Sequence, residues 1–387
     1  MDTQPHLPLT PSHALAPLSI CFPFLGRTFG GSHRATLLLA ANLPAGISPR
    51  FVVHEHGPCT EHLAAAGIPF EILPLPPLAG SDRSRLPLLS HVARATPALR
   101  AYLKRTGAGL VHCNDGRMNV TWGPPARLAG LPFVWHQHSQ YVPSRFANLF
   151  LHLADAIIGV SNYSLEHLPR RARRRAHVIA NPFDVDVAFP ERGEARRQFV
   201  ERHGLPHGAV IVAFVGNLTE QKRPMVFVNA IERLRLEDTR VVGVLFGEPR
   251  EPLAAAVRRS NAVRLLGFQF PIEPALAACD ILLAPAVEEG FGRSLVEAML
   301  VGTPVVAAVS GGQRDIVRDR DNGLLVPPDD DEALAAAARE ILRNPSVTLE
   351  MTARARASAR ATYSTAAHAA SVVAVYRSLT VRRPLAA

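Results

Sequence analysis

The sequence predicts an α/β protein built from two Rossmann-like domains, each with a parallel sheet. Three observations lead to this prediction. A chain of 387 residues exceeds one ordinary hydrophobic core, which favours two domains. Short apolar segments alternate with helical patterns, as they do in parallel α/β folds. The alternation starts again after a polar stretch, residues 185–208, that ends in glycine and proline turn signals.

Composition limits the class of protein. Apolar residues make up 48% of the chain and charged residues 19%, which is typical of a globular protein. The net charge of +9 favours anionic partners, namely nucleotide phosphates, an anionic membrane surface or nucleic acid, without choosing among them. The four cysteines (Cys21, Cys59, Cys113 and Cys279) are scattered, which predicts reduced thiols in a cytoplasmic protein and no metal site.

The N-terminal stretch, residues 1–17, is rich in proline and has no Lys or Arg before its apolar residues. It therefore lacks the charged start of a signal peptide, and we expect a flexible leader. The sequence has no apolar run of about 18 residues, so no transmembrane helix is expected. These features predict a cytoplasmic protein whose membrane contact, if any, is peripheral.

The first half begins with a buried strand at residues 18–25, a loop that contains Gly30 and Gly31, and a helix at residues 35–43. Strand, glycine loop and helix form the first unit of a parallel sheet. The glycine pair lies at the carboxyl end of the strand, where ligands bind in such sheets, although turn geometry alone also explains it. Further strands are predicted at residues 51–56, 70–75, 109–115, 133–138, 156–161 and 177–184. We expect the first domain to span residues 18–188.

Polar residues follow two of these strands. Asn114, Asp115 and Arg117 come after one, and His136 and His138 lie at the end of the next. Loops at this edge of a parallel sheet carry function more often than other loops. A single histidine there is also a common structural hydrogen-bonding residue, so both roles stay open for His138.

The densest basic cluster, residues 169–177, carries five arginines between Arg170 and Arg175, with Ala172 among them. Each basic residue near an anionic leaflet contributes about 1 kcal/mol, so the cluster is a candidate for peripheral membrane contact. A solvated helix end is the favoured interpretation.

The second half begins with a strand at residues 209–217, a loop with Lys222 and Arg223, and a helix at residues 225–236. Two cations there would neutralise a diphosphate without a metal, and a plain surface role is the alternative. Further strands are predicted at residues 241–247, 263–268, 280–287, 303–308 and 323–328, and helices at residues 331–344 and 365–379. We expect a second domain over residues 189–364 and a C-terminal helix within residues 365–387.

The stretch EEGFGRSLVEAM joins a strand to a helix and carries two carboxylates, Glu289 and Glu297, eight positions apart. Gly290 and Gly292 let the backbone approach a ligand, and the amides of the first helical turn suit a phosphate. A different interpretation is open from the residues alone. Ser294 and Glu297 match the S-x-x-E capping box, and Glu289 would then be a solvated loop residue.

Several motifs in the same order resemble the retaining glycosyltransferases of family 4, which have the GT-B fold, from about Ser19 to Leu379. EGFGRSLVE resembles the family's E-x7-E signature. The other motifs are VGTPVVAAVSGGQRDIV, VRLLGF, ACDILLAP, NGLLVPPDD, VGNLTEQKRP, ADAIIGVSNYSLEHL and ANPFD. The resemblance implies two Rossmann-like domains whose parallel sheets face a central cleft, with a C-terminal helix that returns to the first domain.

The resemblance also implies roles for individual residues. Glu289 and His138 would be catalytic and face the donor sugar, Glu297 would hold the ribose, and Phe268 and Gln269 would flank the base. The implied donor-binding set is Gly30, Gly31, Asn217, Lys222, Arg223, Phe268, Gln269, Gly290, Phe291, Gly292, Arg293, Ser294 and Glu297.

The implied diphosphate site departs from the family pattern. Lys222 and the helix start at Arg293 would contact the phosphates, but Asn217 stands where the family has an arginine, and Arg223 where it has a glycine. We hypothesise that Arg223 supplies the missing cation. In the segment that closes the first domain, Pro182 replaces the family's usual glycine.

The implied reaction moves a hexose-type sugar from a UDP or GDP sugar to a hydroxyl, with retention and without a metal or cofactor. The departing phosphate would accept the proton of the attacking hydroxyl. A glycan or lipid-linked acceptor is expected, in cell-surface polysaccharide, lipopolysaccharide or glycolipid synthesis, and Asn114, Asp115 and Arg117 are acceptor-binding candidates.

Two alternatives remain. A sugar-nucleotide 2-epimerase shares the two-domain fold. A non-catalytic nucleotide-binding or nucleic-acid-binding protein would explain the positive charge, but the chain lacks aromatic residues interleaved with basic ones, so no nucleic-acid partner is expected.

Overall fold

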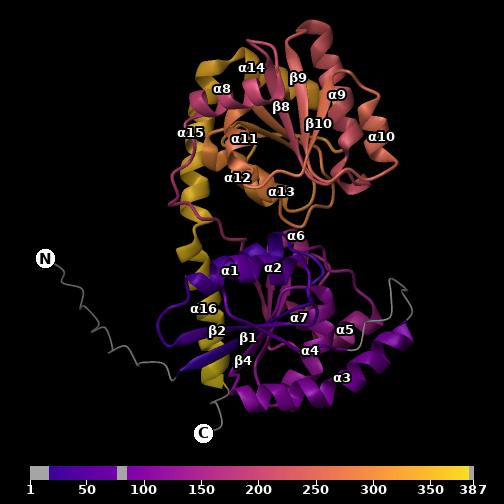
Figure 1. The fold of residues 1–387 in the computed structure, drawn as a ribbon, viewed down its shortest axis with the longest axis vertical. Helices are drawn as coiled ribbons and strands as arrows, with labels where there is room; N and C mark the ends of the chain where they lie inside the picture. The colour runs from indigo at the N-terminus through magenta and orange to yellow at the C-terminus, as the bar shows by residue number, and fades with distance from the viewer. Residues whose placement is uncertain (1–16, 76–84, 383–387) are drawn as a thin grey trace, which may run out of the picture.

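The computed structural model describes residues 17–75 and 85–382, which form two α/β domains stacked one above the other (Figure 1). The first domain contains a seven-stranded parallel sheet with the order β3-β2-β1-β4-β5-β6-β7. Its strands are β1 (Leu18–Phe24), β2 (Ile47–Val53), β3 (Phe70–Ile72), β4 (Leu110–Cys113), β5 (Phe133–Gln137), β6 (Ala156–Gly159) and β7 (Ala176–Val178). The predicted leader lies outside the described residues, apart from its last residue.

Helices cover both faces of the first sheet because alternate strand residues point to opposite sides. The first-domain helices are α1 (Gly31–Ala41), α2 (Pro58–Ala65), α3 (Arg85–Thr106), α4 (Gly116–Leu128), α5 (Arg145–Leu151), α6 (Asn162–Leu165) and α7 (Arg170–Arg173). Ile20 and Phe22 pack into the core on the side of α1 and α2. Cys21, between them, packs into the core on the side of α3 and α4.

The second domain contains a six-stranded parallel sheet with the order β10-β9-β8-β11-β12-β13. Its strands are β8 (Val210–Val215), β9 (Val241–Phe246), β10 (Val263–Gly267), β11 (Ile281–Ala284), β12 (Val305–Ala308) and β13 (Leu324–Val326). Its helices are α8 (Arg192–His203), η1 (Glu220–Lys222), α9 (Pro224–Glu237), α10 (Leu253–Arg258), α11 (Glu273–Ala278), α12 (Arg293–Val301), α13 (Gln313–Ile316), α14 (Asp331–Arg343) and α15 (Pro345–Thr362). The prediction of two parallel-sheet domains is confirmed.

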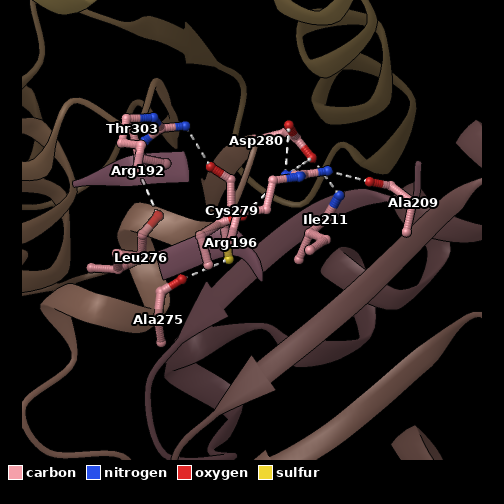
Figure 2. Close-up of polar contacts among 10 residues, drawn as sticks. Arg192, Arg196, Ala209, Ile211, Ala275, Leu276, Cys279, Asp280 and Thr303 are labelled. Atoms are coloured by element: carbon pink, nitrogen blue, oxygen red, sulfur yellow. Dashed lines mark hydrogen bonds and ion pairs between the residues drawn. The ribbon is translucent and has the colours of Figure 1, made fainter. Parts of the chain in front are cut away.

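Two arginines on α8 bind the first helix of the second domain to the rest of that domain (Figure 2). Arg192 donates to the Thr303 hydroxyl (2.6 Å) and the Cys279 carbonyl (2.8 Å). Arg196 donates to both oxygens of Asp280 (3.0 Å each), and Asp280 also accepts from the Ile211 amide. These contacts therefore hold α8 against the start of β8 and the residues just before β11 and β12.

The last helix, α16 (Thr365–Arg382), leaves the second domain and runs along the side of the first domain (Figure 1). Val372 and Tyr376 are fully buried in the same core as Ile20 of β1. The predicted return of the C-terminal helix to the first domain is confirmed.

The predicted strand at residues 177–184 is mostly wrong, because β7 ends at Val178. Pro182 has no amide hydrogen to donate to a sheet. Phe183 instead donates to the Tyr363 carbonyl (2.8 Å) and forms an isolated bridge with Ser364, between α15 and α16. The two connections between the domains therefore lie side by side.

Candidate active site

The loop from β11 to α12 lies at the carboxyl end of the second sheet and faces the first domain. Gly292 has φ +102° and is the residue before α12, a conformation that favours glycine. A Cβ at Gly311 or Gly312 would lie 2.4 Å from the carbonyl oxygen of Glu289 or Gly290 respectively. The loop after β12 therefore supports the Glu289 backbone through two glycines, and the Gly312 amide donates to the Glu289 carbonyl (2.7 Å).

The capping-box interpretation of Glu297 is wrong. Helix α12 starts at Arg293 with Gly292 as its N-cap, and no side chain caps it. Glu297 is the fifth helical residue, too far along to reach the N-cap amide. Its side chain is only 8% exposed and lies between Arg293 (3.6 Å) and Arg34 (4.0 Å). Burial raises the pKa of Glu297, and the two arginines oppose that rise.

Glu289 forms an ion pair with Lys222, with 2.5 Å between Oε2 and Nζ. About a fifth to a quarter of each side chain is exposed (21% and 24%), so the pair borders the cleft rather than the core. Lys222 also packs against Gly216, where a Cβ would lie 3.0 Å from the lysine Cδ. A cation and a carboxylate thus lie together at the start of α12.

Two predicted phosphate-site residues make other contacts. Arg223 has φ +54° and donates to Asp329 (2.5 Å) and to the Glu220 carbonyl. Asn217 accepts from the Glu248 amide (3.0 Å) on the neighbouring loop. Neither side chain bonds to Lys222 or Glu289 among the described residues. By contrast, Ser294 and Lys222 line one small pocket together with Glu289.

The first domain contributes α1 and the loop after β5. Gly31 is the first residue of α1, and a Cβ there would lie 2.8 Å from Cδ of Arg293. Gly30 is the N-cap of α1 and has open space beside it. A Cβ at Gly290 would lie 2.1 Å from the His138 carbonyl oxygen, so this glycine lets the two loops touch. The predicted residues of the two domains therefore meet at one place.

His138 is partly buried beside Asn114, with 3.4 Å between His138 Nε2 and the Asn114 side-chain oxygen. Burial, together with the positive charge of Arg293 and nearby histidines, lowers the pKa of His138 to about 3. The imidazole is therefore neutral at pH 7. A neutral ring suits hydrogen bonding to a sugar hydroxyl better than attraction of a phosphate.

The three predicted acceptor residues separate in the structure. Asn114 is buried beside His138, whereas Arg117 is exposed. Asp115 accepts from the Met118 amide (2.8 Å) and caps α4, and burial raises its pKa. Asn114 is thus the member of this set that adjoins the predicted catalytic histidine.

The predicted base-binding segment follows β10. Phe268 is 71% exposed and Phe270 50% exposed, which is unusual for phenylalanine, and Gln269 between them is half-buried. The Arg34 guanidinium carbon lies 4.5 Å from the Phe270 ring centre, so α1 reaches this loop.

Sequence reasoning missed three residues of the site: Arg34, Phe270 and Ser161. Ser161 donates to the Gly290 carbonyl across the domain interface (2.5 Å). Arg34 follows Gly31 by three positions, which places it on the same side of a helix, and this spacing was the available signal. Ser161 lies in the motif ADAIIGVSNYSLEHL at the end of a predicted strand, and this position was the available signal.

A cavity of about 450 Å³ extends the cleft between α1, the interdomain connection and helices α11 and α12. Arg34, Glu273 and Arg293 line its polar part, and Leu37, Phe189 and Leu300 line its apolar part. Among the described residues, no three His, Cys, Asp or Glu side chains are grouped to hold a metal ion.

The basic cluster lies on and after α7, and none of its arginines lines the cavity beside α12. Arg173 donates to the Leu168 carbonyl (3.0 Å) and Arg175 to the Ala154 carbonyl. Arg170, Arg171 and Arg174 are exposed. No helix in the described parts of the chain has both the length and the apolar character needed to cross a bilayer.

Comparisons with known proteins place the chain in a family. A family model described as Glycosyltransferase Family 4 matches residues 29–187, and one described as Glycosyl transferases group 1 matches residues 209–344. The D-inositol 3-phosphate glycosyltransferase of Xylanimonas cellulosilytica is 33% identical over 250 residues, which cover 60% of this chain and 58% of that protein. The 2-deoxystreptamine glucosyltransferase of Streptomyces kanamyceticus is 30% identical over 277 residues, or 64% of this chain and 71% of that protein.

The fold also matches solved structures. The Anabaena protein HepE, in complex with UDP and glucose, has a TM-score of 0.78 and 22% identity, covering 94% of this chain and all (100%) of that one. The fold is the two-domain GT-B fold, and the chain belongs to glycosyltransferase family 4. It spans 39% to 58% of the length of four relatives named as D-inositol 3-phosphate glycosyltransferases.

Proposed function

We propose that the protein transfers a hexose-type sugar from a UDP or GDP sugar to a hydroxyl acceptor, with retention and without a metal ion. The observation that carries this proposal is the start of α12. There Glu289, Lys222 and the free helical amides lie together, and the neighbouring Gly290 contacts the His138 backbone of the first domain. A helix N-terminus beside a lysine suits a diphosphate, and the carboxylate beside it suits sugar hydroxyls.

In this proposal the donor lies along α12. The phosphates contact the amides of Arg293 and Ser294 and the Lys222 ammonium, while the Glu297 carboxylate accepts from the ribose hydroxyls. The exposed rings of Phe268 and Phe270 flank the base. UDP is the ligand named for HepE, which makes a UDP sugar the first donor to test.

Donor binding would change the partner of Lys222. In the ligand-free protein its ammonium neutralises Glu289 at 2.5 Å. A diphosphate at α12 attracts the ammonium more strongly than one carboxylate does, because it carries more negative charge. Lys222 would then stabilise the leaving diphosphate, and Glu289 would be free to accept hydrogen bonds from the sugar.

The chemical step follows from this placement. Negative charge grows on the diphosphate as the bond to the sugar breaks, and preorganised cations and amides stabilise that charge without a divalent ion. The departing phosphate accepts the proton of the acceptor hydroxyl on the same face. His138, neutral at pH 7, orients the sugar rather than taking the proton.

The acceptor would approach from the first domain, past Asn114. Two of the relatives are named for cyclitol acceptors, an inositol phosphate and 2-deoxystreptamine. A free cyclitol and a glycan or lipid-linked hydroxyl of the cell envelope are therefore the two acceptor classes to compare. Both present a hydroxyl as the nucleophile.

The test is a thermal-shift panel with UDP-glucose, UDP-galactose, UDP-N-acetylglucosamine and GDP-mannose, followed by assays of sugar transfer. We expect one sugar nucleotide to raise the melting temperature, because ligands that bind only the native state stabilise it. Glu289→Gln should then abolish most turnover, while Glu288→Gln, an exposed neighbouring carboxylate, should not. If no sugar nucleotide stabilises the protein, the transferase proposal is wrong.

The same assays separate the alternatives. Conversion of the sugar nucleotide to its 2-epimer without an acceptor would identify an epimerase. Salt-sensitive RNA or DNA binding with no response to sugar nucleotides would identify a nucleic-acid-binding protein.

We also propose peripheral contact with an anionic membrane through the exposed arginines 170, 171 and 174, at the cytoplasmic face. Sedimentation with vesicles of 30% anionic lipid, for the natural chain and a triple Arg→Ser variant, tests it. Equal sedimentation of both would contradict it.

A further inference from the structure

A row of buried polar rings connects His138 to the C-terminal helix. The Tyr376 hydroxyl lies 2.6 Å from His112 Nδ1, and His112 Nε2 lies 3.2 Å from His136 Nδ1. The His136 ring stacks on the His138 ring with 4.2 Å between their centres. These four side chains come from α16, β4, β5 and the loop after β5, and we call them the histidine ladder.

All members of the histidine ladder are uncharged near pH 7. Burial lowers the pKa of His112 and of His138 to about 3, and that of His136 well below its usual value. Burial also raises the pKa of Tyr376, so its hydroxyl keeps its proton. Each imidazole therefore carries one proton, and the two hydrogen bonds allow only two arrangements of these protons.

In the first arrangement the Tyr376 hydroxyl donates to His112 Nδ1, and His112 Nε2–H donates to His136 Nδ1. One buried group, His136 Nε2–H, then has no partner among the described residues. In the second arrangement His136 Nδ1–H donates to His112 Nε2, and His112 Nδ1–H donates to the Tyr376 hydroxyl oxygen. The Tyr376 hydroxyl proton and the His136 Nε2 lone pair are then both unpaired. Unpaired buried polar groups are costly, so the first arrangement is favoured.

We propose that Tyr376, His112 and His136 are positioning residues for His138, so that the C-terminal helix sets the orientation of the ring that faces the donor sugar. This inference rests on the proposed function. The ladder holds His136 in one tautomer and one plane, and His138 lies against that ring. Without the Tyr376 hydroxyl, His112 and His136 can exchange tautomers or turn, and His138 loses its fixed neighbour.

Two buried donors beside His138 support a ligand-directed role. His136 and Asn114 are 3% and 4% exposed, and the His136 Nε2 and Asn114 Nδ2 atoms have no partner among the described residues. Native proteins rarely leave such groups unpaired. A substrate oxygen, or a water molecule held by one, would satisfy them next to His138.

The first test reads the tautomers directly in protein labelled with ¹⁵N-histidine. Long-range ¹H–¹⁵N spectra should show the proton on Nε2 in both His112 and His136. In Tyr376→Phe, the His112 and His136 shifts should move toward a mixture of tautomers, and the His138 signals should shift with them. A proton on His136 Nδ1 in the natural chain, or unchanged His136 and His138 signals in the variant, would overturn the proposal.

The second test is kinetic, measured as release of UDP from UDP-glucose or GDP from GDP-mannose with acceptor present. Tyr376→Phe should lower kcat about tenfold while the donor KM and nucleotide affinity stay within about twofold, because Tyr376 does not reach the donor site. His112→Gln, which keeps a donor toward His136, should retain more activity than His112→Phe.

Leu379→Ala is the matched control, because Leu379 is buried on the same helix one turn farther along. It should lower the melting temperature without lowering kcat. A kcat for Tyr376→Phe equal to that of the natural chain, or an equal loss in Leu379→Ala, would overturn the positioning role. Absence of transfer by the natural chain would instead contradict the proposed function itself.

Discussion

The two walls of the cleft use different chemistry. The wall from the second domain is charged, with Glu289 paired to Lys222 and Glu297 next to Arg293. The wall from the first domain contributes one cation, Arg34 of α1, which approaches Glu297, and otherwise consists mainly of uncharged groups. Its histidines are neutral because burial lowers their pKa values, and Asn114 beside them is an amide.

This difference fits a division of work in the proposed function. A departing diphosphate needs fixed positive charge, which the second domain and the start of α12 supply. Sugar and acceptor hydroxyls need oriented hydrogen-bonding groups, and a neutral wall supplies these without competing for the phosphates.

Lys222→Met removes the cation next to Glu289. We expect kcat/KM for sugar transfer to fall about 10²- to 10³-fold, because the loss of one group that stabilises the transition-state charge has an effect of this size. Arg223→Met is the control, since Arg223 pairs with Asp329, and it should change kcat/KM less than about threefold. A comparable loss in Arg223→Met would instead support our hypothesis that Arg223 is the second phosphate cation.

Acidification should lower the free energy of unfolding, because the first-domain wall contains buried neutral histidines. The folded-state pKa of His112 is about 3, below the 6.5 of an unfolded histidine. Between these two pH values the unfolded chain therefore binds more protons than the folded chain. Stability is therefore lost as the pH falls, by about 2 kcal/mol at pH 5 for this residue. Urea unfolding at pH 7 and pH 5 measures it.

In His112→Phe, this part of the pH dependence should disappear. An NMR titration provides a second readout that needs no variant. The His112 ring signals should not titrate between pH 8 and pH 5, and a midpoint near 6.5 would contradict the assignment of a buried neutral ring.

Glu297→Gln keeps the shape of the residue that we place at the ribose but removes its charge. UDP should bind about tenfold more weakly by calorimetry, because a hydrogen bond to a charged group is lost. The affinity for pyrophosphate, which has no ribose, should stay unchanged or rise. Equal loss for both ligands would show that Glu297 does not act at the ribose.

Arg196→Met tests the charge at the amino end of the second sheet, opposite the edge that carries the α12 loop (Figure 2). We expect the free energy of unfolding to fall by about 1 kcal/mol with kcat unchanged, because the bonds of Arg196 to Asp280 and to backbone carbonyls are structural. Arg197→Met is the control. Arg197 is 78% exposed and pairs with Glu194, so its loss should change stability by less than about 0.5 kcal/mol. A fall in kcat for Arg196→Met would contradict the separation of structural from functional charge.

Much of the fold followed from local patterns. Buried parallel strands are short apolar runs between helical segments, and such runs placed every strand except the last of the first sheet close to its observed position. That strand failed because residues 179–184 contain Pro182, and the chain there turns to pair with residues 363 and 364. A contact between segments about 180 residues apart leaves no local signal.

The candidate site was predicted in part for the same reason. The double glycine at residues 311 and 312 and the loop from Glu289 to Gly292 are local patterns, and the structure brings them into contact. Ser161 and Arg34 belong to the other domain, and their approach to Gly290 and Glu297 depends on how the domains meet. Whether Glu297 caps the helix or faces the cleft depends on the residue at which α12 begins, and the structure shows that this is Arg293.

Local sequence patterns were enough to predict the two parallel-sheet domains, the family and the two carboxylates on either side of a helix start, because these depend on neighbouring residues. Three further features came from tertiary contacts: which cation pairs with Glu289, which of Asn114, Asp115 and Arg117 adjoins His138, and that Tyr376 reaches His112. These are contacts across 24 to 264 positions of the chain. Packing of whole helices and sheets sets such contacts, and no local pattern encodes them.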